Sequence, residues 1–278
     1  MKNTPLKTSI MTRLSRLAKE REVPFQNILT DFLIERAAAR LTSDRSLFDH
    51  LVFKGGYVSL RVYSSPRYTV DLDAVIRGLD RGVAVEKARA AMSSNLSDEV
   101  WFRFESVQDL VAQNEYGGVR LVYRAGLGEQ LTDLKRAQII HIDLGVGDPI
   151  TPSPREIRTT THIFDEPLSW KVYPLESIVA EKLHALFSHG SQNSRSKDVF
   201  DLHFLLPRAD VELLRQALSH TFTYRGDTVP NSLGATLEDI DRTTLRRGWR
   251  SAMRDFINPP DFEEAFGAIL SYLRTHGI

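Results

Sequence analysis

Residues 54–76, KGGYVSLRVYSSPRYTVDLDAVI, contain a glycine pair followed by two aspartates that are separated by one leucine. The alternation in YTVDLDAVI predicts a strand with Asp71 and Asp73 on one face. The opposite, apolar face comprises Val70, Leu72, Ala74 and Ile76. Two neighbouring carboxylates repel each other. A hard divalent cation such as Mg²⁺, which binds carboxylate and phosphate oxygens, would compensate for that repulsion.

A third carboxylate lies in QIIHIDLGV, residues 138–146. This segment also reads as a strand, with Ile140, Ile142 and Leu144 on one face and His141 and Asp143 on the other. If the two strands are neighbours, Asp143 would complete a two-metal clamp for in-line attack on phosphorus. The alternative is that Asp71 and Asp73 are solvent-facing aspartates on an edge strand.

The glycine pair suits a phosphate group, because glycine lets backbone N–H groups approach phosphate oxygens closely. We expect Gly55 and Gly56 to serve in this way, with Lys54 adding positive charge. A glycine pair alone is more often an ordinary turn. The order of a glycine pair, an Asp-x-Asp strand and a third strand aspartate is that of the nucleotidyltransferase fold.

A second group of charges lies in PLESIVAEKLHALFSHGSQNSRSKDVFDLHFLL, residues 174–206. Lys182 falls within a predicted helix, and Arg195 and Asp198 flank the start of the next one. A lysine and an arginine near metal-binding carboxylates would neutralise a triphosphate. Alternatively, Lys182 is a surface lysine and Asp198 is an acid favoured by the helix dipole. A surface lysine adds little to stability, so its replacement is predicted to leave stability unchanged.

The overall pattern predicts an α/β (α+β) fold with a mixed sheet flanked by helices, followed by a helical C-terminal domain. We expect N-terminal helices in residues 1–50, a core in residues 51–174 and a helical part in residues 175–278. Pro24 separates two helices within residues 8–42, and residues 82–95 read as a crossover helix. Residues 118–127 and 138–146 read as strands.

Composition limits the partners of the chain. Its 278 residues carry 36 Lys+Arg against 36 Asp+Glu, so nucleic-acid binding would need a local basic patch. One candidate is a stripe of arginines four residues apart beside Trp249, and the basic N-terminal segment is a second. The stripe consists of Arg242, Arg246, Arg250 and Arg254. The alternative is a solvated helix face with Trp249 in the core.

The absence of cysteine excludes disulfides and cysteine-ligated zinc, and it fits a reducing cytoplasm. No apolar run approaches the roughly 18 residues of a membrane span. The N-terminus lacks the features of a secretory signal. We therefore expect a cytoplasmic monomer that makes no membrane contact.

Three segments together resemble the AbiEii/AbiGii nucleotidyltransferase toxin family. Residues 54–73 resemble its KGG…R-[FY]-[ST]-x-D-L-D block, and HIDLGVGD resembles its D-[IL]-G-x-G-D strand end. Residues 174–206 resemble its A-x-K-L-H-A-L…[RK]-D-x-x-D-L block. The three segments occur in the family's order and cover roughly residues 52–206. The family includes toxins of type IV abortive-infection and MenT-type toxin–antitoxin pairs.

The resemblance implies Mg²⁺- or Mn²⁺-dependent transfer of a nucleoside monophosphate from an NTP, in the MenT branch to the 3′ end of tRNA, and a cognate antitoxin. It implies that Asp71, Asp73, Lys182 and Asp198 are catalytic, and that Asp71, Asp73 and Asp143 bind metal. The implied nucleotide-binding residues are Lys54, Gly55, Gly56, Arg67, Thr69 and Arg195. Tyr57 departs from the family, which commonly has a small residue there, and residues 57–70 form a long interval. Transfer to a protein (AMPylation) and a non-catalytic nucleotide-binding module are the alternatives.

Overall fold

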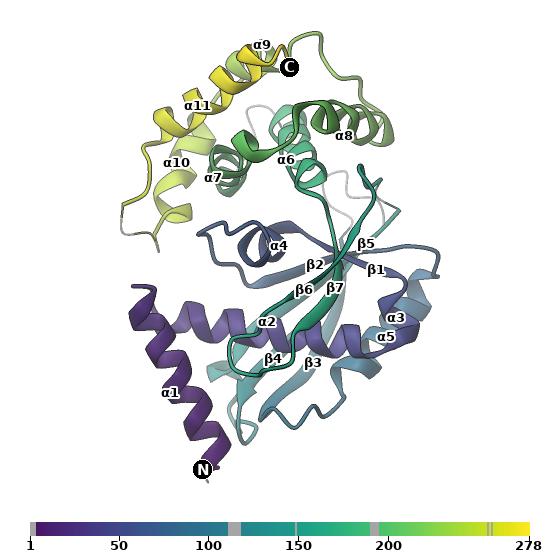
Figure 1. Ribbon diagram of the computed structural model, residues 1–278, viewed down its shortest axis with the longest axis vertical. Coiled ribbons are helices and arrows are strands. Elements are labelled where there is room, and N and C mark those ends of the chain that lie inside the picture. Colours follow the sequence, from purple (N-terminus) through teal and green to yellow (C-terminus); the bar gives the residue numbers. More distant parts are fainter. Residues whose placement is uncertain (1–3, 111–117, 148, 190–194, 255, 257) are drawn as a thin grey trace. The chain divides into compact units, whose positions relative to one another are not determined.

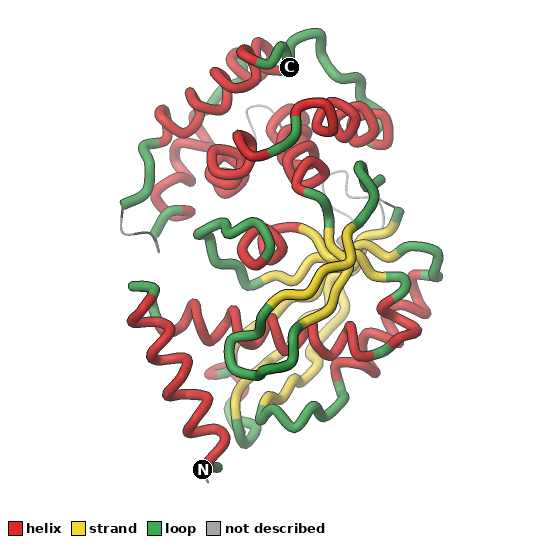
Figure 2. Tube along the Cα trace, in the orientation of Figure 1, coloured by secondary structure: helices red, strands yellow, loops and turns green. Residues whose placement is uncertain are grey.

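The computed structural model describes residues 4–110, 118–147, 149–189, 195–254, 256 and 258–278. The chain divides into two compact units. The first contains residues 1–62, 66–147 and 155–172, and the second contains residues 63–65, 148–154 and 173–278. Figure 2 shows strands and helices in the first unit and mainly helices in the second. The predicted fold class, a mixed sheet with helices and a helical C-terminal part, is confirmed.

The first unit is built on one sheet, which has seven strands within the described residues, in the order β3-β4-β5-β2-β1-β7-β6. Strands β2 and β5, and β1 and β7, run parallel, and the other neighbours are antiparallel. The strands are β1 (Leu51–Lys54), β2 (Asp71–Ile76), β3 (Val100–Leu110), β4 (Gly118–Leu127), β5 (Gln138–Val146), β6 (Arg155–Thr159) and β7 (Leu168–Val172). The helices are α1 (Pro5–Glu20), α2 (Phe25–Ser43), α3 (Arg45–Phe48), α4 (Gly55–Arg61) and α5 (Arg81–Met92).

Helix α2 lies across the sheet and contacts β2, β5 and β7 (Figure 1). Two arginines of α2 fix it to the start of β3, where Arg40 and Arg36 donate hydrogen bonds of 2.7–2.9 Å to the buried carboxylate of Asp98. Burial alone would raise the pKa of Asp98, but these hydrogen bonds outweigh it and hold the pKa below 3.8. The buried ion pairs thus define where α2 crosses the sheet.

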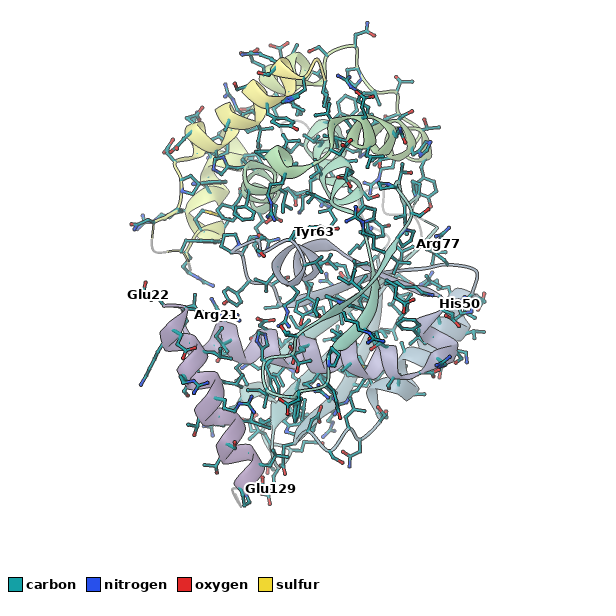
Figure 3. The ribbon with its side chains drawn as sticks, in the orientation of Figure 1. Arg21, Glu22, His50, Tyr63, Arg77 and Glu129 are labelled. Carbon is teal, nitrogen blue, oxygen red and sulfur yellow. The ribbon has the colours of Figure 1, made fainter. Side chains whose placement is uncertain are left out.

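The register between β1 and β2 is closed at one end by His50 and Arg77, both labelled in Figure 3. The backbone N–H of Arg77 donates to the carbonyl of His50 at 2.8 Å, and His50 Nδ1 lies 2.7 Å from the carbonyl oxygen of Arg77. Leu51 then pairs with Ile76, and Lys54 pairs with Asp73. The glycine pair therefore lies directly beside strand β2, which carries Asp71 and Asp73.

The second unit consists of helices packed in succession. Helix α6 contacts α7, α8 and α9, and α7 contacts α10 and α11. The bounds are α6 (Leu175–His189), α7 (Ser196–Leu205), α8 (Val211–Tyr224), α9 (Leu233–Glu238), α10 (Thr243–Ala252) and α11 (Phe262–Thr275). Asp210, Ser232 and Asp261 cap the starts of α8, α9 and α11 by accepting backbone N–H groups. No helix among the described residues is both long and apolar enough to span a membrane.

Three local predictions differ from the structure. Strand β2 begins at Asp71, and Val70 is 48% exposed rather than part of the apolar face. The glycine pair opens helix α4, where the sequence did not indicate a helix. Strand β3 was not predicted, because its exposed positions do not strictly alternate with its buried ones and a β-bulge interrupts its pairing between Phe104 and Ser106.

Candidate active site

Strands β2 and β5 bring three carboxylates to one face of the sheet. Asp71 pairs with His141, and Asp73 pairs with Asp143, so all four side chains are on the same face. Residues that alternate with them, such as Leu72 and Ile142, are fully buried on the opposite face. Strand β2 lies between β1 and β5 in the sheet, so Asp71 and Asp73 are not on an edge strand. The sequence prediction of a shared acidic face agrees with this geometry.

The glycine pair gives Asp73 room beside the start of α4. Gly55 has φ +71°, and a Cβ at this position would overlap the carboxylate of Asp73. A Cβ on Gly56 would lie 3.0 Å from Arg67 Nη2 and 3.4 Å from Thr69 Cβ. The loop before β2 therefore folds directly over the glycines. Only glycine allows this close approach at residue 55.

The other predicted nucleotide-binding residues of the first unit gather at the same place. Thr69 Oγ1 accepts the backbone N–H of Asp71 at 3.2 Å, and the Arg67 side chain is largely buried beside Gly56. Lys54 precedes the glycines and is the register partner of Asp73. These residues form a single cluster with the Asp71–Asp73 pair.

Tyr57, the departure from the family pattern, points away from this cluster. Its side chain is fully buried, and its ring packs edge-on against Trp170 with 5.7 Å between centroids. Tyr57 thus serves as a core residue of α4 that anchors the glycine turn to β7. A small residue at this position would leave that contact unmade.

An arginine and a histidine contact these carboxylates, and the sequence did not identify either as a site residue. Arg120 on β4 donates from Nε to Asp143 Oδ1 at 2.8 Å and from Nη2 to Asp143 Oδ2 at 2.7 Å. The same Nη2 is 3.8 Å from Asp71 Oδ1. His141 Nδ1 lies 2.8 Å from Asp71 Oδ1. The hydrogen bonds to Asp143 raise the pKa of Arg120, which keeps it charged. The Arg120 guanidinium therefore supplies compensation that the sequence assigned to metal alone.

The second predicted group lies in the second unit. Lys182 Nζ on α6 is 2.5 Å from Asp198 Oδ1 and 2.8 Å from Asp201 Oδ2, both on α7. The side chains of Lys182 and Asp198 are 11% exposed, and Asp201 is fully buried. Arg195 Nη1 is 3.5 Å from Asp198 Oδ2. Lys182 is therefore not a snorkelling surface lysine, and the prediction that it contributes little to stability conflicts with this geometry.

Two of the four arginines in the predicted stripe contact an acidic residue, and Arg254 lies beyond the end of α10 at Ala252. Arg242 and Arg246 both pair with Glu263 of α11. Trp249 is 8% exposed, packs edge-on against Phe262 and donates its indole N–H to the carbonyl of Pro260 at 3.1 Å. Stacking of a base on Trp249 is thus excluded, and this part of the surface agrees better with a salt-bridged helix face.

The family can be assigned from the sequence as a whole. Residues 36–270 match the family model described as nucleotidyl transferase AbiEii toxin, type IV toxin–antitoxin system. The chain belongs to this family. The match covers most of the chain and confirms the resemblance seen in the three motifs. Membership in an AbiEii toxin family of type IV systems also implies an antitoxin partner. A search of curated protein sequences gives no match.

Solved structures support the fold of this AbiEii family member. MenT4, a nucleotidyltransferase toxin from Mycobacterium tuberculosis H37Rv, aligns with TM-score 0.56 at 18% identity, covering 93% of this chain and 98% of MenT4. A putative nucleotidyltransferase from H. pylori aligns with TM-score 0.53 at 16% identity, covering 92% and 96%. JHP933 from Helicobacter pylori aligns with TM-score 0.51 at 17% identity, covering 92% and 93%. At these identities the likeness establishes the fold.

The metal that AbiEii-type chemistry implies can be tested against the donor atoms. Within the described residues, no set of three or more histidine, aspartate or glutamate side chains is arranged to hold a metal ion. Asp71 and Asp73 nevertheless fit a hard cation, because they share a face, Asp71 is 35% exposed, and Gly55 leaves room beside Asp73. Asp143 does not fit as a third ligand in the observed arrangement, since Arg120 contacts both of its oxygens.

Proposed function

We propose that this protein is a metal-dependent nucleotidyltransferase toxin that transfers a nucleoside monophosphate from an NTP to the 3′ end of tRNA. The observation that carries the proposal is the Asp71–Asp73 pair on β2, directly beside the turn at Gly55. Two carboxylates next to a close backbone approach are suited to a triphosphate with its divalent cation. Family membership supports the same reaction class.

In the proposed reaction, Asp71 and Asp73 hold Mg²⁺ or Mn²⁺. When bound, such a cation neutralises phosphate oxygens and favours ionisation of an acceptor hydroxyl. The backbone at Gly55 and Gly56, with Lys54, orients the triphosphate. The acceptor oxygen attacks the α-phosphorus, the bond from the α-phosphorus to the bridging oxygen breaks, and pyrophosphate and a proton are released. Positioning of the reactants accounts for much of the rate in such reactions.

Thr69 and Arg67 assist by shaping the loop over the glycines. Thr69 Oγ1 accepts the backbone N–H of Asp71 and so fixes the start of the metal-binding strand. For the second unit, we propose that Lys182, Arg195 and Asp198 contribute to nucleotide binding, as the family motif implies. Lys182 and Asp198 form one ion pair, so we expect them to act together.

The acceptor is proposed to be RNA because of the surface of α1. A groove on this helix is lined by polar and basic side chains and by one methionine, without an acidic residue: Lys7, Thr8, Met11, Thr12, Ser15, Arg16 and Lys19. Such a surface suits a phosphate backbone. Arg16 in this groove is paired with Glu20 at 3.3 Å. Its other basic residues, Lys7 and Lys19, make the groove a better candidate than the α10 stripe, where Arg242 and Arg246 share Glu263.

The test is to incubate the protein with each α-³²P-labelled NTP, total tRNA and Mg²⁺ or Mn²⁺. Label in RNA is the expected result, and it should disappear in Asp71→Asn and Asp73→Asn. The matched control is Asp165→Asn, which changes an exposed aspartate in the loop before β7. Label in protein would instead indicate AMPylation. The absence of label from both RNA and protein, with all four NTPs and both metals, would identify a non-catalytic nucleotide-binding module.

A further inference from the structure

Four strands each contribute one charged residue to a single row across the sheet. Lys54 on β1 pairs with Asp73 on β2, Asp73 pairs with Asp143 on β5, and Asp143 pairs with Arg120 on β4. Residues directly opposite each other on neighbouring strands have side chains on the same face. The row therefore reads cation, acid, acid, cation. Arg120 is the member of the row that neither the sequence motifs nor the family match assigns.

The contact between Arg120 and Asp143 is bidentate. Nε and Nη2 of Arg120 reach the two different oxygens of Asp143 at 2.8 and 2.7 Å. Charge-assisted pairs of this geometry are among the strongest hydrogen bonds in proteins, and they fix the plane of the guanidinium. A cation bound to Asp143 would have to share an oxygen with this guanidinium and would be repelled by its charge.

The bidentate contact with Asp143 leaves other N–H groups of the Arg120 guanidinium for a ligand. A guanidinium has about five N–H groups, and the two hydrogen bonds to Asp143 use one on Nε and one on Nη2. The Arg120 side chain is 29% exposed, and its Nη2 is 3.8 Å from Asp71 Oδ1. The remaining donors are thus held next to the Asp71–Asp73 pair. The planar shape of the group is matched to phosphate oxygens.

We propose that Arg120 binds the phosphate groups of the NTP and that Asp143 is a positioning residue which holds Arg120, not a third metal ligand. This inference rests on the proposed function, because it concerns the same site. Asp143 would then influence nucleotide binding only through Arg120. Metal binding would depend on Asp71 and Asp73.

The sheet offers a matched control pair. Arg124, four residues along β4, donates from Nε to Glu105 Oε1 on β3 at 2.8 Å. The side chains of Arg124 and Glu105 are 19% and 33% exposed, comparable to 29% and 14% for Arg120 and Asp143. Arg124→Gln and Glu105→Gln therefore remove a similar ion pair from the same strand without touching the Asp71–Asp73 pair.

The experiment uses the full chain and two equilibrium measurements. The first is filter binding of each α-³²P-labelled NTP, and the second is Mn²⁺ binding without nucleotide, followed by the electron paramagnetic resonance signal of free Mn²⁺. We expect Arg120→Gln and Asp143→Asn each to weaken NTP binding by about 10- to 100-fold, the loss for a hydrogen bond to a charged group. The double variant should bind no more weakly than either single variant. The control variants should bind as the wild type does.

Mn²⁺ binding separates the two roles of Asp143. We expect Asp143→Asn to bind Mn²⁺ within about fivefold of the wild-type affinity, because this variant loses only one nearby negative charge. Asp71→Asn should lose Mn²⁺ binding. Loss of Mn²⁺ in Asp143→Asn equal to that in Asp71→Asn would overturn the proposal. So would unchanged NTP binding in Arg120→Gln, or additive losses in the double variant.

A second variant and NTP binding by the wild type distinguish the remaining outcomes. If Arg120→Gln does not fold, as judged by circular dichroism, Arg120→Lys keeps the charge but cannot form the bidentate contact, and it should still weaken NTP binding. If the wild type binds no NTP at all, the proposed function itself fails. If the wild type binds NTP and the Arg120 variants bind equally well, only the role of Arg120 is refuted.

Discussion

Replacing Lys182 by methionine should destabilise the second unit strongly. The Lys182 ammonium lies 2.8 Å from the carboxylate of Asp201, which is fully buried, and 2.5 Å from Asp198. Methionine preserves the length of the side chain but removes the charge, so a buried carboxylate loses a cationic partner. Removing one partner of a buried ion pair typically costs about 3–5 kcal/mol. This is a large part of the roughly 5–15 kcal/mol that stabilises an ordinary domain.

The measurement is urea unfolding of the full chain, followed by far-UV circular dichroism and by tryptophan fluorescence. Two compact units can unfold in separate transitions, so both probes are needed to see which transition moves. Trp249 belongs to the second unit, and Trp101 and Trp170 belong to the first, so tryptophan fluorescence reports on both units. The matched control is Lys197→Met, an exposed lysine on α7, which should change stability by less than about 0.5 kcal/mol.

A second substitution separates lost charge pairing from lost packing. Lys182→Met combined with Asp201→Asn removes the buried carboxylate as well, and it should recover more than half of the lost stability. If Lys182→Met unfolds within 0.5 kcal/mol of the wild type (roughly the range of surface substitutions), the ion pair is not important for folding. The lysine would then be the surface residue that the sequence allowed. Loss of activity in a Lys182 variant can be attributed to catalysis only after its folded fraction is known.

Three further outcomes are expected. Gly55→Ala should destabilise by about 1–3 kcal/mol in urea unfolding and weaken Mn²⁺ binding, because φ is +71° and the new Cβ would displace the Asp73 carboxylate. Asp98→Asn should cost most stability above pH 3.8, and its deficit should shrink at lower pH, because the folded pKa of Asp98 is lowered and the wild type loses that stability as pH falls through it. Lys19→Glu should weaken tRNA binding and reduce its salt slope by about one, whereas Arg246→Glu should change neither; the reverse result would assign RNA to α10.

The acidic face could be predicted because a strand has a period of two. Asp71, Asp73 and Asp143 interrupt apolar runs at alternate positions, and only one arrangement buries the apolar partners. The bounds of β4 and β5 match the predicted segments 118–127 and 138–146 for the same reason. These features depend on local patterning, which a single sequence contains.

The contacts of these residues could not be predicted, because they depend on strand order and register. Nothing in GVRLVYRAGL marks Arg120 as different from Arg124, yet the first contacts Asp143 and the second contacts Glu105. Helix α4 was missed because glycine disfavours helices by about 1 kcal/mol each, and here two glycines open the helix. The missing information is tertiary in each case.

The row formed by Lys54, Asp73, Asp143 and Arg120 bears on how the sheet tolerates neighbouring aspartates. If a divalent cation alone offset the repulsion between Asp71, Asp73 and Asp143, the sheet would be strained without metal, and metal binding would be coupled to folding. Arg120 and His141 instead contact the acids directly, and Lys54 stands at the other end of the row. The fold can therefore hold its acids together before any ligand arrives. In the proposed reaction, binding energy from the metal and the nucleotide would then be left for positioning the reacting groups, which is where it can increase the rate.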